Sequence, residues 1–244
     1  YLFGKYDGTS RDWDDLAYSS PYYLMMKAAG NDRGDYASLN SADNGYDLLT
    51  GGALSKNNMT IAAVDPMVSY VDPSSVTMSS FSSYGPADDG RVKPDLSADG
   101  VGLYSAASTG DSDYSTKSGT SMATPSATGT MLLLQEHYSD LNGGAFMRSA
   151  TLKGLVINTS DETGSFDGPD YGFGWGLLNA NAAATAITNN IAGTAIIDEQ
   201  TLNDGATYTT SVYSNGVDPI QLVVCWTDPA GVAYFQGGGT GTTE

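Results

Sequence analysis

The stretch SGTSMATPSATGTMLLLQEHY, residues 118–138, constrains the fold of this chain more than any other segment. Small side chains occupy its first turns, together with Pro125, and proline is tolerated where a helix begins. The segment is apolar on nearly all sides, and a helix of that kind is normally buried. We therefore expect a central helix here, covered by other elements of a domain with a sizeable core.

Short apolar runs elsewhere predict the other elements of this domain. Residues 22–29 end at Gly-Asn and residues 58–64 end at Asp-Pro, as expected for buried parallel strands. A short strand is expected around Asp95 to Ala98, within otherwise irregular sequence. Helices are expected at 144–159 and in the Ala-rich run LLNANAAATAI. Together these elements predict an α/β domain built on a doubly wound parallel sheet.

The composition changes after residue 190. Thr207 to Tyr213 and Gln221 to Trp226 alternate in polarity and are separated by Asn-Gly and Asp-Pro, which are turn signals. Residues 191–244 are too few for a β-sandwich, which usually takes about 100 residues. We therefore predict two parts: residues 1–190 from an α/β domain, and residues 191–244 as the start of a truncated antiparallel β-sandwich.

The charge balance excludes several classes of partner. Ten Lys and Arg against 28 Asp and Glu give a net charge of −18, which repels nucleic acid and anionic membranes. The sequence contains no run of 18 apolar residues, so it predicts no membrane-spanning helix. The 30 glycines and many Ser and Thr residues favour a secreted or cell-surface protein. Cys225 is the only cysteine, and we expect it to be a small buried side chain.

One serine stands where the predicted central helix begins. The unpaired N–H groups and the dipole of a helix N-terminus favour negative charge, so the N–H of Ser121 could donate to an oxyanion while its hydroxyl acts as nucleophile. Asn31 could supply a second, neutral donor. A serine alone at this position would more simply be a helix cap. The lipase motif G-x-S-x-G does not fit, because residue 123 is alanine.

Several motifs resemble those of one enzyme family. SGTSMATP resembles the nucleophile motif of the subtilisin-like serine peptidases (peptidase S8), and AAGN resembles their oxyanion-asparagine motif. SSFSSYGP, GRVKPDLSADG and YGFGWGLLNANAAA are also similar to family segments, in the family's order, although SADG lacks the usual proline. The resemblance implies a subtilisin-like fold and an endopeptidase that forms an acyl-enzyme on Ser121. It also implies substrate-binding positions at Ala28, Ala29, Gly30, Gly119 and Thr120.

The rest of the family's catalytic triad is not found in this sequence. In the family the aspartate and histidine precede the serine, and the 30 residues before Asn31 contain no histidine. His137 follows Ser121 along the same predicted helix by roughly 24 Å, too far for a general base. We therefore expect the triad His and Asp in an N-terminal part of the same protein, and this piece alone to be inactive. The alternative is a non-catalytic pseudopeptidase or structural surface protein.

The proposed chemistry requires no cofactor, and no residue is assigned as a metal ligand. Acidic clusters nevertheless make a structural calcium ion an expectation, since calcium takes six to eight oxygen ligands. Solvated surface charge is the alternative interpretation of each cluster. The clusters are Asp12/Asp14/Asp15, Asp43/Asp47, Asp88/Asp89, Asp111/Asp113 and Asp161/Glu162/Asp167/Asp170.

Overall fold

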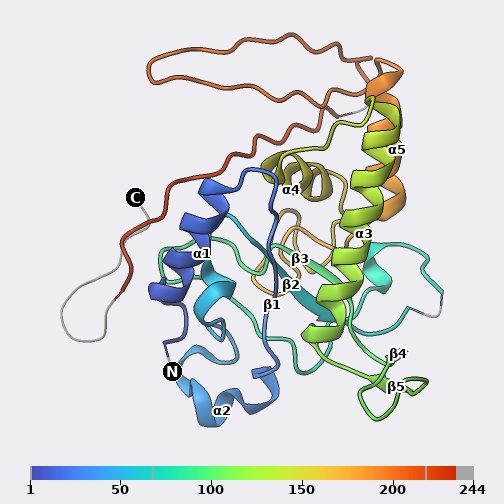
Figure 1. The fold of residues 1–244 in the computed structure, drawn as a ribbon. Coiled ribbons are helices and arrows are strands. Elements are labelled where there is room, and N and C mark those ends of the chain that lie inside the picture. The colour runs from blue at the N-terminus through green and yellow to red at the C-terminus, as the bar shows by residue number, and fades with distance from the viewer. Residues whose placement is uncertain (1, 68, 218, 235–244) are drawn as a thin grey trace.

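A parallel sheet forms the centre of the computed structural model, which describes residues 2–67, 69–217 and 219–234 (Figure 1). Its described strands are β1 (Met26–Ala28), β2 (Met59–Val64) and β3 (Leu96–Asp99), in the order β1-β2-β3. Met26 lies opposite Met59, and Ile61 opposite Leu96. The predicted parallel sheet is confirmed, and its middle strand matches the expected residues 58–64.

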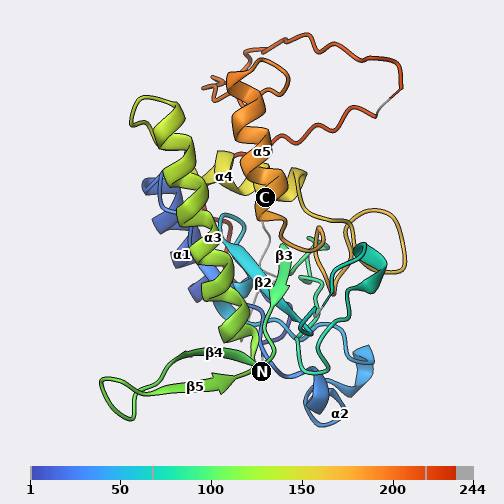
Figure 2. The ribbon, with the colours of Figure 1, turned by 90° about the vertical axis from the view of Figure 1, so that its right-hand side faces the viewer.

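Three helices cover one face of this sheet. They are α3 (Thr120–Leu141), α4 (Ser149–Asn158) and α5 (Ala180–Ile191), and α3 and α5 lie side by side in Figures 1 and 2. Because side chains alternate along a strand, Met59, Ile61 and Ala63 all face this layer. They pack against the α3 residues Ala123, Ala127, Met131 and Leu134.

The opposite face is covered by shorter segments. Ala53 and Leu54 of the 3-10 helix η3 (Gly51–Leu54) are buried there with Ala29 and Leu49. Helix α1 (Gly8–Ser19) packs on η3, and the hydroxyl of Ser10 donates to the carbonyl of Gly51 at 2.7 Å. Both faces are therefore buried, as a parallel sheet requires.

The burial of α3 differs from the sequence-based expectation. Its buried residues follow one stripe, whereas Leu132 and Leu133 on the other side are 67% and 66% exposed. Within the described ranges, the sheet and α5 cover only the inner side of this helix. The prediction of burial on all sides is therefore wrong for this chain, because burial depends on neighbours that the helix sequence does not specify.

Two elements begin later in the structure than the sequence predicted, because of residues at their starts. The strand expected at 22–29 begins only at Met26, and Tyr22 and Tyr23 are exposed before it. Helix α4 begins at Ser149, since Gly143 and Gly144 end the preceding helix with φ of +66° and +92°. The strand around Asp95 and the Ala-rich helix are confirmed. The remaining short helices are α2 (Tyr36–Leu39), η1 (Arg33–Asp35), η2 (Ser41–Asp43) and η4 (Pro73–Ser75).

The structure contains an antiparallel pair, but not where it was expected. Strands β4 (Leu103–Ala106) and β5 (Tyr114–Lys117) form a hairpin that extends away from the sheet in Figure 2. Residues 207–213 and 221–226 are irregular and form no strand. A strand requires a partner for its hydrogen-bond ladder, and none is present in the described part of the chain. The boundary at residue 190 stays a prediction, and residues 235–244 lie outside the described residues.

None of the helices in the described part of the chain is long and apolar enough to cross a bilayer.

Candidate active site

Ser121 lies in the first turn of α3 and is exposed. Its N–H has no intrahelical acceptor, because the first N–H groups of a helix point out of its end. The chain enters the helix through Gly119, with φ +154° and ψ +159°, a conformation essentially restricted to glycine. The N–H of Gly119 donates to the carbonyl of Gly100 at 2.8 Å, which holds this turn against the end of β3.

Thr120 joins the helix start to Asn31. Its backbone N–H and its hydroxyl both donate to Oδ1 of Asn31, at 2.9 and 3.0 Å. The same hydroxyl accepts from the N–H of Gly30 at 3.2 Å. With Oδ1 bound in this way, the amide group Nδ2 of Asn31 lies on the side of Gly119, 3.6 Å from the position of a Cβ on that glycine. A neutral donor is thus held beside the helix N-terminus.

The segment before Asn31 is fixed by the sheet. Ala29 is buried and donates its N–H to the carbonyl of Ile61 at 3.0 Å. Gly30 has a φ of +117°, and its carbonyl accepts from the N–H of Ser83 at 2.9 Å. A Cβ on Gly30 would stand 2.8 Å from the hydroxyl oxygen of Ser83, so a larger residue would clash.

The structure therefore gathers all the site residues proposed from the sequence. Two segments 90 positions apart meet at the end of β1: one carries Ala28, Ala29, Gly30 and Asn31, and the other carries Gly119, Thr120 and Ser121. The hydrogen bonds of Thr120 to Gly30 and Asn31 fix the position of the two segments relative to each other. Their roles in catalysis and substrate binding stay predictions.

The only histidine lies elsewhere. Nε2 of His137 is 3.0 Å from the hydroxyl of Thr188 on α5, in the far half of α3 from Ser121. This placement agrees with the expectation that His137 does not serve as the base.

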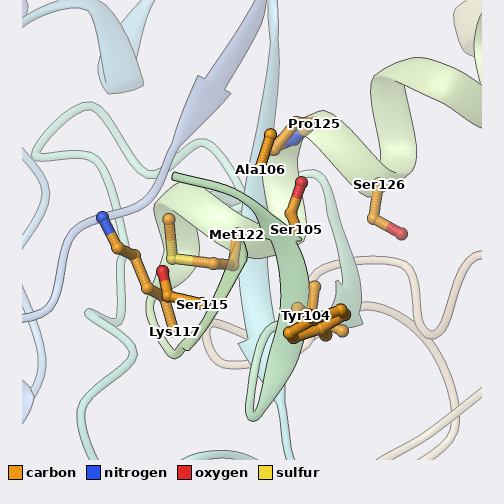
Figure 3. Close-up of a pocket in the computed structure, with 9 residues that line it drawn as sticks. Tyr104, Ser105, Ala106, Ser115, Lys117, Met122, Pro125 and Ser126 are labelled. Carbon is orange, nitrogen blue, oxygen red and sulfur yellow. The ribbon is translucent and has the colours of Figure 1, made fainter. Parts of the chain in front are cut away.

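A pocket of about 470 Å³ lies against the first turns of α3, and sequence reasoning missed it (Figure 3). Its walls come from the β4–β5 hairpin, including Lys117, and from Met122, Pro125 and Ser126 of α3. The stacked rings of Tyr104 and Tyr114, 5.5 Å apart, lie exposed on the hairpin. The alternation in LYSA and YSTK around a Gly-Asp turn was the available signal for the hairpin.

A buried group of charges lies at the start of β3 and was also missed. The carboxylate of Asp95 accepts from Nζ of Lys93 at 2.6 Å, from Nζ of Lys153 at 2.9 Å and from the N–H of Thr60 at 2.7 Å. Burial, together with the neighbouring Lys153, lowers the pKa of Lys93 to about 7, although Asp95 acts in the opposite direction. This network ties the start of β3 to β2 and α4.

No three His, Cys, Asp or Glu side chains among the described residues are placed to hold a metal ion together. Calcium therefore stays an expectation from the acidic composition.

Known proteins resemble this chain in sequence and in fold. The sequence model of the Subtilase family matches residues 3–176. Serine protease AprX of Bacillus subtilis (strain 168) is 33% identical over 163 residues, which cover 62% of this chain and 33% of that protein. C5a peptidase of Streptococcus pyogenes serotype M18 is 30% identical over 162 residues, which cover 61% of this chain and 14% of that protein.

A solved structure is similar as well. The CspB protease of Clostridium perfringens matches with a TM-score of 0.50 at 25% identity, over 59% of this chain and 30% of that one. The chain thus spans about a third or less of the length of the proteins it matches.

Proposed function

Because the chain belongs to the subtilase family, we propose that the intact protein is a serine endopeptidase in which Ser121 forms an acyl-enzyme. The observation that supports this proposal is the Thr120 bridge. It holds Nδ2 of Asn31 beside the end of a helix whose second residue is an exposed serine. Two donors and a nucleophile around one position form the oxyanion-stabilising part of a site for acyl transfer.

The reaction would proceed in two stages. Oγ of Ser121 attacks the peptide carbonyl, and the N–H of Ser121 together with Nδ2 of Asn31 stabilises the negative oxygen of the tetrahedral intermediate. A histidine from the N-terminal part of the protein takes the hydroxyl proton and passes it to the leaving amine, and an aspartate orients that histidine. Water then hydrolyses the ester bond to Ser121 by the same route in reverse.

The substrates of such an enzyme are proteins or peptides. We propose that the chain around Ala28, Ala29 and Gly30 binds substrate on one side of Ser121, together with Gly119 and Thr120. The net charge of −18 supports a protein that does not bind nucleic acid, and the 30 glycines with many Ser and Thr residues support a secreted or cell-surface location. The chemistry needs no cofactor, and calcium would serve only a structural role.

Active-site labelling of the intact protein tests the proposal. A fluorophosphonate reacts only with an activated serine, so the folded wild type should be labelled and Ser121→Ala should not. Ser139→Ala is the matched control, since Ser139 lies on the same helix near its far end. Wild-type protein that folds but takes no label would favour the non-catalytic alternative, and labelling of Ser121→Ala would place the nucleophile elsewhere.

The role of Asn31 has a separate test. Asn31→Ala removes one oxyanion donor and should lower kcat of the intact protein by roughly 10²- to 10³-fold, with little change in KM. Asn142→Ala is the control, because its amide only caps the last turn of α3 by donating to the carbonyl of Tyr138. A fall in kcat below about fivefold for Asn31→Ala would contradict the proposed oxyanion hole.

A further inference from the structure

The last described segment of the chain, residues 226–234, differs from the stretch that precedes it. Residues 201–224 are exposed throughout their described part, and Tyr213 is completely exposed. Gly231 and Ala233 are buried, by contrast, and Figure 1 shows this red segment running past α1. A short segment without secondary structure becomes buried only when it has specific partners.

The first partner is Asn57, which lies just before β2 and is 7% exposed. Its Nδ2 donates to the carbonyl of Asp228 at 2.8 Å, and its Oδ1 accepts from the N–H of Asp228 at 3.0 Å. One side-chain amide thus pairs with both backbone groups of one residue, as a neighbouring strand would. Next to it, Nζ of Lys56 donates to the carbonyl of Pro229 at 2.7 Å.

The second partner is Tyr6 at the other end of the chain. Its hydroxyl accepts from the N–H of Gly231 at 3.1 Å, and its carbonyl accepts from the N–H of Tyr234 at 2.6 Å. The ammonium of Lys5 lies over the ring of Tyr234, 5.5 Å from its centre. Residues separated by more than 220 positions are therefore joined through three different contacts.

Asp14 of α1 connects the two anchors. This fully buried carboxylate accepts from the hydroxyl of Tyr6 at 2.7 Å and from the N–H groups of Lys56 and Asn57 at 3.0 and 2.9 Å. The same carboxylate thus orients both Tyr6 and the backbone of Asn57, the two residues that contact the C-terminal segment. Buried networks of this kind are strong when every member is satisfied.

We infer that residues 226–234 act as an intramolecular clamp that completes the subtilase unit, with Tyr6, Asp14, Lys56 and Asn57 as its receptor surface. The chain then leaves the α/β domain after α5, runs through the exposed residues 201–224 and returns to the domain at residues 226–234. The predicted boundary at residue 190 therefore does not separate the clamp from the sheet. The clamp stabilises the entry to β2, whose residue Ile61 accepts a hydrogen bond from the N–H of Ala29 beside the candidate active site.

Hydrogen exchange on the full chain tests the clamp. In the wild type, the amides of Asp228, Gly231 and Tyr234 should exchange far more slowly than those of residues 203–212, which are exposed. Asn57→Ala removes two hydrogen bonds to Asp228, each contributing a factor of about five, so exchange at Asp228 should accelerate at least roughly tenfold. Asn142→Ala is the control and should leave the segment protected.

A milder variant separates the two anchors and also covers the case in which Asn57→Ala does not fold. Tyr6→Phe removes the hydroxyl that accepts from Gly231 and donates to Asp14, so exchange at Gly231 should accelerate about fivefold, and at Tyr234 by less. Wild-type amides of residues 228–234 that exchange like those of an unstructured peptide would overturn the inference. Unchanged protection of Asp228 in folded Asn57→Ala would overturn it equally.

Discussion

Asp95→Asn should destabilise this protein strongly, because one carboxylate neutralises two buried ammonium groups. The side chains of Lys93, Asp95 and Lys153 are 3%, 7% and 13% exposed. Asparagine has nearly the same shape but no charge, and its NH₂ group would face an ammonium in place of an oxygen. Removing one partner of a buried ion pair costs about 3–5 kcal/mol, which is a large share of the roughly 5–15 kcal/mol that stabilises a typical domain.

Urea unfolding followed by tryptophan fluorescence measures this loss. The free energies of unfolding of the wild type and Asp95→Asn should be compared at pH 6. Lys93 carries its proton in the folded protein at this pH, since burial lowers its pKa only to about 7. Asp12→Asn is the matched control: Asp12 is 66% exposed in its pair with Arg11, so its loss should cost less than about 1 kcal/mol. A loss below about 1 kcal/mol for Asp95→Asn would refute the reasoning, because the network would then not neutralise buried charge.

Three further predictions address other parts of the molecule. Burial lowers the pKa of Lys93 from 10.5 to about 7, so the unfolded state binds more protons between these values, and urea titrations at pH 7 and 9 should show higher stability at pH 9. Thr120→Val removes the hydroxyl that bonds Gly30 and Asn31, and steady-state kinetics of the intact protein should show kcat reduced roughly tenfold. Asp7→Ala removes the cap of α1 and should cost about 1 kcal/mol in thermal unfolding, whereas an unchanged midpoint would contradict the cap.

Much of the fold could be predicted because its signals are local. The apolar run of β2 is buried at every residue from Met59 to Val64, and its polar flanks with the following Asp-Pro were enough to predict it. The glycines before and within the candidate site were also predictable, since Gly30 and Gly119 adopt backbone angles that other residues avoid. The motifs around Asn31 and Ser121 predicted which segments would meet, although not how.

Other expectations failed because they depended on neighbours. Leu132 and Leu133 read as core residues, yet they are exposed, because α3 is covered on one side only in the described part of the chain. Residues 207–213 have strand composition, but the described residues offer them no strand to pair with. Composition shows whether a segment has apolar side chains to bury or residues suited to a strand. The surrounding structure decides whether those side chains are buried and whether the strand finds a partner.

The sequence by itself determined the family resemblance, the middle strand, the helices α3, α4 and α5, and the position of the candidate nucleophile at a helix start. Only the tertiary structure showed the Thr120 bridge that orients Asn31 behind Ser121, and the Asp95 network. It alone also showed the contact of Tyr6 with residues near the other end of the chain. The physical reason is that helix and strand signals act over a few residues. Directional hydrogen bonds and buried charges instead depend on side chains that come together from positions far apart, and their strength depends on how completely the fold excludes water around them.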